Sequence, residues 1–138
     1  MPLDAAALTA LMHAASAYRG HYASILEGYA ITPEQIAADL FHVAEKEGVL
    51  LGFYSLTLVP EPELDLLFVS DHAQGAGLGA ALFRHMAGEA KRLGVAAVKI
   101  ISHPPSAGFY ETMGATVIGT KPPTPKARWA RPILCFRP

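Results

Sequence analysis

The sequence has very little cysteine and no run of residues with metal-ligand spacing. Its one cysteine, Cys135, excludes an internal disulfide and argues against a thiolate metal cage. We expect Cys135 to be a small buried residue on the last strand. The six histidines are scattered along the chain without the spacing of metal ligands. We therefore expect no metal.

The chain also lacks a strong charge of either sign and a long apolar run. Its formal net charge of −1 argues against a dedicated nucleic-acid binder. No stretch approaches the roughly 20 apolar residues that a membrane-spanning helix needs. The apolar N-terminal segment is interrupted by Asp4 and has no basic residue before it, unlike a signal peptide. We expect a cytoplasmic protein with no nucleic-acid partner and no membrane contact.

The composition is that of a globular protein. The 138 residues are 51% hydrophobic and 17% charged, which is enough to build a core without disulfides or metals. We find no internal repeat and no linker that would divide the chain. The expectation is therefore a single domain spanning residues 1–138.

Hydrophobic periodicity and turn residues predict a mixed α/β chain. Helices are expected at residues 4–19, from Thr32-Pro33 onward, at 78–93 and after Pro104. Strands are expected at residues 41–45, 49–59, 63–69, 95–102, 115–120 and 133–136. Residues 21–31 fit either a second helical segment or a packed loop. The buried side of the helix at 78–93 is expected to carry Leu78, Leu82, Met86 and Leu93.

A glycine-rich turn joins the strand at 63–69 to the helix at 78–93. Gly75, Gly77 and Gly79 stand at alternate positions, where backbone N–H groups and a helix N-terminus can hold a phosphate or pyrophosphate. A P-loop would need a lysine and a hydroxyl residue after the last glycine, but alanines stand there. The spacing also differs from the G-x-G-x-x-G of dinucleotide-binding folds.

With the Leu-Phe-Val strand end before it, the turn at residues 74–79 resembles the acyl-CoA-binding motif of the Gcn5-related N-acetyltransferases (the GNAT family). That motif reads Gln or Arg, two residues, Gly, one residue, then Gly or Ala. Residues 106–115 are similar to the second motif of the family, in which a small residue precedes an aromatic–Tyr pair and a glycine follows. Phe109, Tyr110 and Gly114 fit this pattern. The resemblance covers roughly residues 32–120, in family order.

The resemblance implies the GNAT acyl-CoA N-acyltransferase fold, a mixed sheet flanked by helices and splayed between the family's fourth and fifth strands. A bulge on the fourth strand keeps the two apart. The family's first strand is expected to be missing or short here. The pantetheine arm of acetyl-CoA, the implied cosubstrate, would lie in the gap. The implied cofactor-binding residues are Phe68, Val69, Gln74, Gly75, Ala76, Gly77, Leu78, Gly79, Ala80, Ser106 (or Ser102 in its place) and Phe109.

The implied chemistry is direct attack of a primary amine on the thioester in a ternary complex. With regular pairing, Glu63, Asp65, Leu67 and Val69 share one face of their strand. Glu63 is the favoured base and Asp65 the alternative, either acting directly or through water. Tyr110 would give a proton to the departing thiolate, and the N–H of Val69 would polarise the carbonyl. No Ser-His-Asp pattern suggests a covalent route.

Two other functions remain open from the sequence. The sequence is also compatible with a non-catalytic acyl-CoA-binding sensor or interaction domain, and with a nucleotide-binding protein of another fold. For an enzyme, the acceptor is a small-molecule or peptide amine. Acids near the expected mouth favour a cationic amine: Glu61, Glu63, Asp65 and Glu111. A missing edge strand is compatible with a homodimer.

Overall fold

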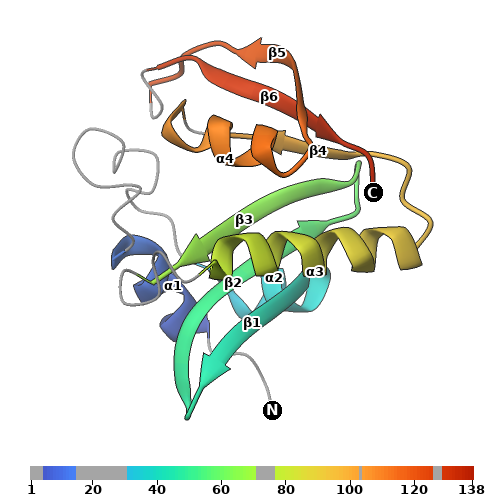
Figure 1. The fold of residues 1–138 in the computed structure, drawn as a ribbon. Coiled ribbons are helices and arrows are strands. Elements are labelled where there is room, and N and C mark those ends of the chain that lie inside the picture. The colour runs from blue at the N-terminus through green and yellow to red at the C-terminus, as the bar shows by residue number, and fades with distance from the viewer. Residues whose placement is uncertain (1–4, 15–30, 71–76, 103, 126–128) are drawn as a thin grey trace.

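A computed structural model describes residues 5–14, 31–70, 77–102, 104–125 and 129–138. It contains a six-stranded mixed sheet in the order β1-β2-β3-β4-β6-β5, with helices on both faces (Figure 1). The strands are β1 (Leu40–Lys46), β2 (Val49–Thr57), β3 (Glu63–Val69), β4 (Val98–Ile101), β5 (Thr116–Lys121) and β6 (Arg131–Phe136). The helical elements are α1 (Ala5–Ala14), α2 (Pro33–Ala38), α3 (Leu78–Arg92), η4 (Pro104–Ser106) and α4 (Ala107–Thr112). The predicted mixed α/β fold is confirmed.

Local sequence signals explain where several elements begin and turn. The side chain of Thr32 accepts a hydrogen bond of 3.1 Å from the N–H of Gln35, and Pro33 occupies the first turn of α2. Between β1 and β2, Glu47 and Gly48 have φ angles of 53° and 79°. Positive φ at both positions suits the tight hairpins that match strand twist. Both features were predicted from the residues.

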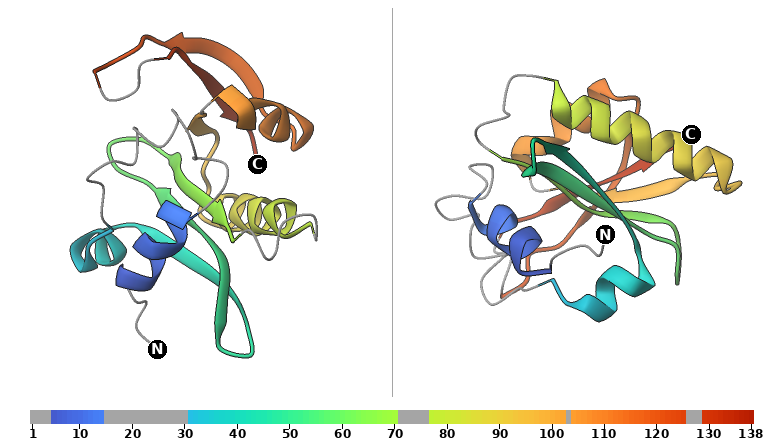
Figure 2. Two further views of the ribbon diagram at one scale, coloured as in Figure 1. Left: turned by 90° about the vertical axis from the view of Figure 1, so that its left-hand side faces the viewer. Right: turned by 90° about the horizontal axis from the view of Figure 1, so that it is seen from below.

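Two hydrophobic cores lie on opposite faces of the antiparallel half of the sheet. Figure 2 shows α3 along one face of β1–β3 and α1 with α2 on the other. On the α3 side, Tyr54 and Leu56 of β2 pack with Leu82, Phe83 and Met86. On the α1 side, the buried residues are Leu8, Leu11, Met12, Ile31, Phe53, Leu66 and Phe68. The two cores fix β3 between a helix above and a helix below.

The pairing of β2 with β3 is irregular at Asp65. Ser55 pairs with Leu66 and Leu56 pairs with Leu64, so β3 contains one residue more than β2 at this point. Asp65 is the extra residue of a β-bulge. A bulge on this strand was implied by the family resemblance, and the structure contains it.

The bulge changes which side chains share a face of β3. Leu64 packs into the α3 core, together with the partly buried Leu67 and Val69, whereas Leu66 packs into the α1 core. Glu63 precedes Leu64 and therefore faces the α1 side. The expectation of one common face is wrong, because it required regular pairing of Glu63, Asp65, Leu67 and Val69.

Strands β3 and β4 are parallel neighbours that pair at one position only. Glu63 is paired with Lys99, and the N–H of Lys99 donates to the carbonyl of Pro62 at 3.0 Å. Beyond this point the two strands diverge towards their carboxyl ends, as Figure 1 shows. We call this divergence the splay. On its other side β4 is paired with β6 along its whole length, from Val98 to Ile101.

Some expectations need correction or fall outside the described residues. Leu93 is 42% exposed because α3 ends at Arg92, so its predicted burial is wrong, whereas Leu82 and Met86 are buried. Cys135 lies on β6 as expected but is only partly buried. The predicted end of the first helix and residues 21–30 of the ambiguous segment lie outside the described ranges. Within those ranges no strand precedes α1, and no helix is long and apolar enough to cross a membrane.

Gly52 on β2 is predicted to be intolerant of a side chain. A Cβ there would lie 2.8 Å from the carbonyl oxygen of Phe68 and 3.1 Å from Cδ1 of Leu82. We expect Gly52→Ala to lower the free energy of unfolding by about 1–3 kcal/mol. The side chain of Leu82 can move away from the new methyl group, but the backbone carbonyl of Phe68 is fixed in the sheet. Urea denaturation measures the change.

Gly88 provides the matched control for Gly52. It lies inside α3, and a Cβ there would meet nothing within 4 Å. Gly88→Ala should therefore raise the free energy of unfolding by about 0.5–1 kcal/mol through helix propensity. Equal effects of the two substitutions would contradict the close approach of β2 and β3 at Gly52.

Candidate functional site

Residues from the two sequence motifs meet where β3 ends and α3 begins. A Cβ on Gly79 would lie 3.7 Å from Cε1 and Cζ of Phe109 and 3.9 Å from Cγ2 of Val69. Val69 ends β3, Gly79 is in the first turn of α3 and Phe109 is in α4. The fold therefore brings together three of the residues proposed for the cofactor from three separate elements.

The N-terminus of α3 has the geometry expected of a phosphate cradle. Gly77 caps the helix with φ 77° and ψ 12°, a left-handed conformation that favours glycine, and no side chain caps it. Its carbonyl accepts the first helical hydrogen bond, from Ala81 N–H at 3.0 Å. The N–H groups of Leu78, Gly79 and Ala80 belong to the first turn, where no helical carbonyl is available. Gln74, Gly75 and Ala76 lie outside the described residues.

The second motif forms a short helix with an aromatic flank. Phe109 and Tyr110 are adjacent on α4, with ring centroids 5.2 Å apart, and both contact Phe83 of α3 at 6.2 and 6.1 Å. Gly114 follows the helix with φ 104°, and Ala115 N–H donates to Tyr110 O at 3.0 Å. Tyr110 is only partly buried, so its position beside the core leaves one side towards the surface.

The two serine candidates occupy different positions. Ser106 ends η4 and directly precedes α4, and it is partly buried. Ser102 is buried immediately after β4, and its N–H donates to the carbonyl of Pro132 at 3.0 Å. Ser102 therefore links β4 to β6, whereas Ser106 belongs to the second-motif helix.

The two candidate bases are in different electrostatic surroundings. Glu63 lies 3.6 Å from the ammonium of Lys99, which also bonds Glu61. The hydrogen bond to Glu61 is the main reason that the pKa of Lys99 is raised. Asp65 forms no ion pair within the described part of the chain. Removal of water by the surrounding protein, and then the charges of Glu63 and Asp39, raise its pKa to about 6. This holds although part of the Asp65 residue is exposed.

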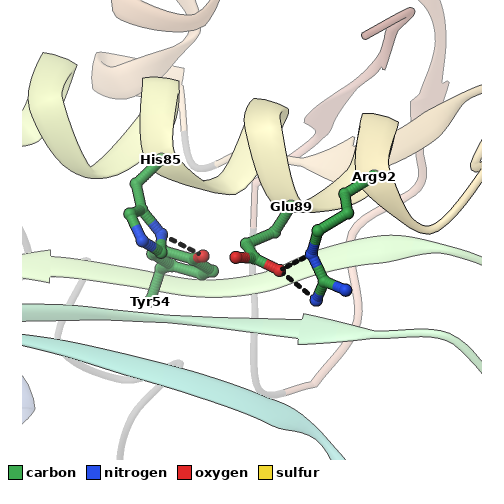
Figure 3. Close-up of polar contacts among 4 residues, drawn as sticks. All are labelled: Tyr54, His85, Glu89 and Arg92. Carbon is green, nitrogen blue, oxygen red and sulfur yellow. Dashed lines mark hydrogen bonds and ion pairs between the residues drawn. The ribbon is translucent and has the colours of Figure 1, made fainter.

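A polar cluster under α3 was not found by sequence reasoning. The hydroxyl of Tyr54 and Nδ1 of His85 share a hydrogen bond of 2.8 Å (Figure 3). The centroid of the His42 ring lies 4.6 Å from that of the His85 ring. Burial, and then the neighbouring His85, lower the pKa of His42. One turn further along, Glu89 accepts from Arg92 at 2.6 Å. The Tyr54–His85 hydrogen bond and the His42–His85 ring contact fasten α3 to β2 and β1, whereas the Glu89–Arg92 pair lies within α3.

The sequence indicates only one half of this cluster, the residues that lie on the helix. His85 and Glu89 are four residues apart on one helix, but their partners His42 and Tyr54 come from a hairpin more than 30 positions earlier. Periodicity therefore predicts the helix face, and only the tertiary fold supplies its partners.

Comparisons with known proteins agree with this architecture. A family model described as the acetyltransferase (GNAT) domain matches residues 23–124. The 5-NmdU N-acetyltransferase of Pseudomonas phage PaMx11 is 32% identical over 81 residues, 56% of this chain and 58% of that protein. The chain thus spans under two thirds of that relative.

Solved structures show the same fold at low sequence identity. The ribosomal-protein-S18-alanine N-acetyltransferase from Escherichia coli superposes with a TM-score of 0.74 at 20% identity, covering 99% of this chain and 91% of that one. A GNAT family acetyltransferase from Elizabethkingia anophelis, with acetyl-CoA bound, gives 0.67 at 16% identity, covering 76% and 80%. Since the family model spans well over half of the 138 residues, the chain belongs to the GNAT family of acetyltransferases.

Proposed function

We propose that this protein transfers an acetyl group from acetyl-CoA to a primary amine, by direct attack in a ternary complex. The observation that carries the proposal is the splay, where β3 and β4 pair only at Glu63 and Lys99. Val69, Gly79 and Phe109 gather at the end of β3 away from that pair. An extended thioester arm placed along β3 would have its diphosphate at the start of α3.

The cosubstrate would be held mainly by backbone. We assign the pyrophosphate to the N–H groups of residues 74–80 and the pantetheine arm to the main chain of Phe68 and Val69. Ser106 and Phe109 would contact the arm from the α4 side. Gly77 already has the left-handed conformation that directs the following amides outward from the helix start.

Asp65 is our choice of general base over Glu63. Glu63 already forms an ion pair with the ammonium of Lys99, at 3.6 Å. Asp65 has a pKa of about 6, so it is ionised at neutral pH yet basic enough to accept a proton from an ammonium acceptor. Its position in the β-bulge also releases it from the regular ladder.

The reaction then balances without a covalent enzyme intermediate. Asp65 takes a proton from the acceptor ammonium, directly or through water, and the amine lone pair forms a bond to the thioester carbonyl carbon. The Val69 N–H stabilises the oxyanion. Collapse breaks the carbon–sulfur bond as the Tyr110 hydroxyl gives its proton to the thiolate. The attacking nitrogen loses its second proton through water to the Tyr110 oxygen, which restores the phenol, and Asp65 releases its proton to solvent. The amide and free CoA leave.

The acceptor is proposed as a primary amine on a small molecule or a peptide. Relatives of this chain carry names for unlike acceptors, 5-NmdU in one and a ribosomal-protein alanine in another. A screen of amines with acetyl-CoA, 5-NmdU and alanine peptides among them, with released thiol as the readout, tests the activity. Binding of CoA without turnover of any amine would favour the acyl-CoA sensor.

Asp65→Asn and Glu63→Gln should separate the two candidate bases. We expect Asp65→Asn to lower kcat by about 100-fold or more and to remove the acidic limb of the pH–rate profile near pH 6. Glu63→Gln should keep that limb and most of kcat. CoA affinity should be unchanged in both variants, which calorimetry checks. The reverse pattern would make Glu63 the base.

Tyr110→Phe tests the proposed acid independently. It should lower kcat by about 10- to 1000-fold with thioester substrates, with little change in CoA affinity or fold, because the ring packing against Phe83 is kept. An unchanged kcat would contradict the role of Tyr110 as general acid and leave it only a role in packing. Steady-state kinetics at saturating acceptor gives the answer.

Gly77→Ala and Gly94→Ala form a matched pair for the cradle. The two glycines flank α3 with φ of 77° and 76°, and a Cβ on either would meet nothing within 4 Å. Both substitutions should cost about 1–2 kcal/mol of stability through left-handed strain. Only Gly77→Ala should also weaken CoA binding, measured by calorimetry. Equal CoA affinity in the two variants would contradict the assignment of the cradle.

The surroundings of Asp65 also predict a pH-dependent stability. Its pKa is 3.8 in an ordinary setting and about 6 in the folded protein. The folded state therefore holds the proton more tightly, and stability falls as pH rises from about 4 to about 6, with the penalty complete above that. Asp65→Asn should gain stability over the wild type across this range, in urea denaturation at several pH values. A constant difference would contradict the desolvation of Asp65.

A further inference from the structure

Two cationic side chains face each other across the last two strands. Lys121 and Arg131 are directly paired in the antiparallel ladder of β5 and β6, so they share a sheet face. Like charges at directly opposite positions destabilise a sheet. No carboxylate in the described part of the chain forms an ion pair with either one. By contrast, Arg92 and Lys99 each have a glutamate partner.

Arg131 has a second unsatisfied feature. Its Nε atom is buried and has no hydrogen-bond partner among the described residues. A buried donor without an acceptor costs free energy, more so when it belongs to a charged group. An anion bound by Lys121 and the terminal nitrogens of Arg131 would remove the like-charge cost, since the guanidinium offers further donors beside the buried Nε and the ammonium a point charge.

The pair lies at the open end of the splay. Pro132, next to Arg131, accepts from the N–H of Ser102, which follows β4 directly. Figure 1 accordingly shows the start of β6 on the same side as the carboxyl ends of β3 and β4. These are the ends at which the two strands are apart.

The pair also shares a sheet face with the proposed acceptor acids. Arg131, Ile133 and Cys135 are two residues apart in succession on β6, so their side chains share one face of the sheet. Cys135 is paired with Lys99 of β4, which places Lys99 on that face too. The ammonium of Lys99 reaches Glu63, which points to the α1 side. This face therefore has the carboxylate of Glu63 on β3 and, on β5 and β6, two cations with no ion-pair partner in the described part of the chain. Such a charge arrangement suits a molecule with both an ammonium and an anionic group.

We propose that Lys121 and Arg131 bind an anionic group, a phosphate above all, carried by the same acceptor molecule whose amine is acetylated. The proposal rests on the proposed acetyltransferase activity and narrows its substrate class. Arg131 would bind two phosphate oxygens and Lys121 a third. The acceptor amine would then lie on the β3 side of the same face.

The experiment compares ω-aminoalkyl phosphates of increasing chain length with the amino alcohols of equal length. In the wild type, kcat/KM for the best phosphate should exceed that of its alcohol by about tenfold or more. Arg131→Gln and Lys121→Gln should lose this preference and keep the alcohol rates within about twofold. Arg137→Gln, an exposed cation just past β6, is the matched control and should keep the preference.

A second readout does not depend on turnover. With CoA saturating the cradle, an aminoalkyl phosphate should raise the melting temperature of the wild type and of Arg137→Gln, but not of Arg131→Gln. Without ligand, Arg131→Gln should melt no lower than the wild type, because it removes a like-charge contact. If inorganic phosphate raised the melting temperature as much as an aminoalkyl phosphate does, Lys121 and Arg131 would be a site for a free anion. That result would overturn their assignment to the acceptor.

The outcomes distinguish this proposal from the proposed function. Turnover of alcohols and phosphates at equal rates in every variant would reject the anion site and leave the acetyltransferase intact. Stabilisation by the phosphate without turnover of any amine would reject the acetyltransferase and leave the anion site. A loss of CoA affinity in Arg131→Gln, absent with dephospho-CoA, would assign the pair to the cosubstrate and reject the acceptor site.

Discussion

The single pairing of Glu63 with Lys99 is the constraint on which the site depends. Parallel strands normally continue their hydrogen-bond ladder, and a sheet gains stability by doing so. Here β4 is instead committed to β6 along its length, and β3 is committed to β2 and bulged at Asp65. Each strand is held by its other neighbour, so the two can stay apart beyond their first contact. An extended ligand between them would have backbone groups of both strands within reach.

The backbone elements around the candidate cofactor site were predictable because their signals are local. The bounds of β3, the start of α3 at Leu78 and the cap at Thr32 follow from apolar runs, glycine and capping chemistry within a few residues. The close approach of Gly79 to Val69 and Phe109 is compatible with the cofactor-binding role that the family resemblance implies for all three. Motifs that position a backbone around a phosphate depend on short-range geometry, and short-range geometry is what a sequence encodes most directly.

The rest could not be predicted because it depends on pairing between distant segments. The bulge arises from the register of Ser55 against Leu66, and neither strand signals it alone. Because of the bulge, the side chain of Glu63 lies on the opposite face of β3 from those of Leu67 and Val69. Glu63 and Asp65 therefore cannot be compared as candidate bases on the assumption of one shared face. The contact of Tyr54 with His85 and the opposition of Lys121 to Arg131 likewise join residues that no periodicity connects. Long-range register decides which charges meet.

The contrast between locally encoded backbone and long-range pairing of side chains bears on which acceptor the protein recognises. The two motifs supply backbone amides and a phenol, groups that handle the cosubstrate and the leaving thiolate for any acceptor. Recognition of the acceptor must therefore come from side chains outside the motifs. We propose that in this chain these are Asp65 on β3 and the opposed cations Lys121 and Arg131 of β5 and β6. An acceptor with an ammonium and an anionic group would offset the charges of Glu63 and Asp39 around Asp65 and the like-charge opposition of Lys121 and Arg131, and both effects would favour its binding.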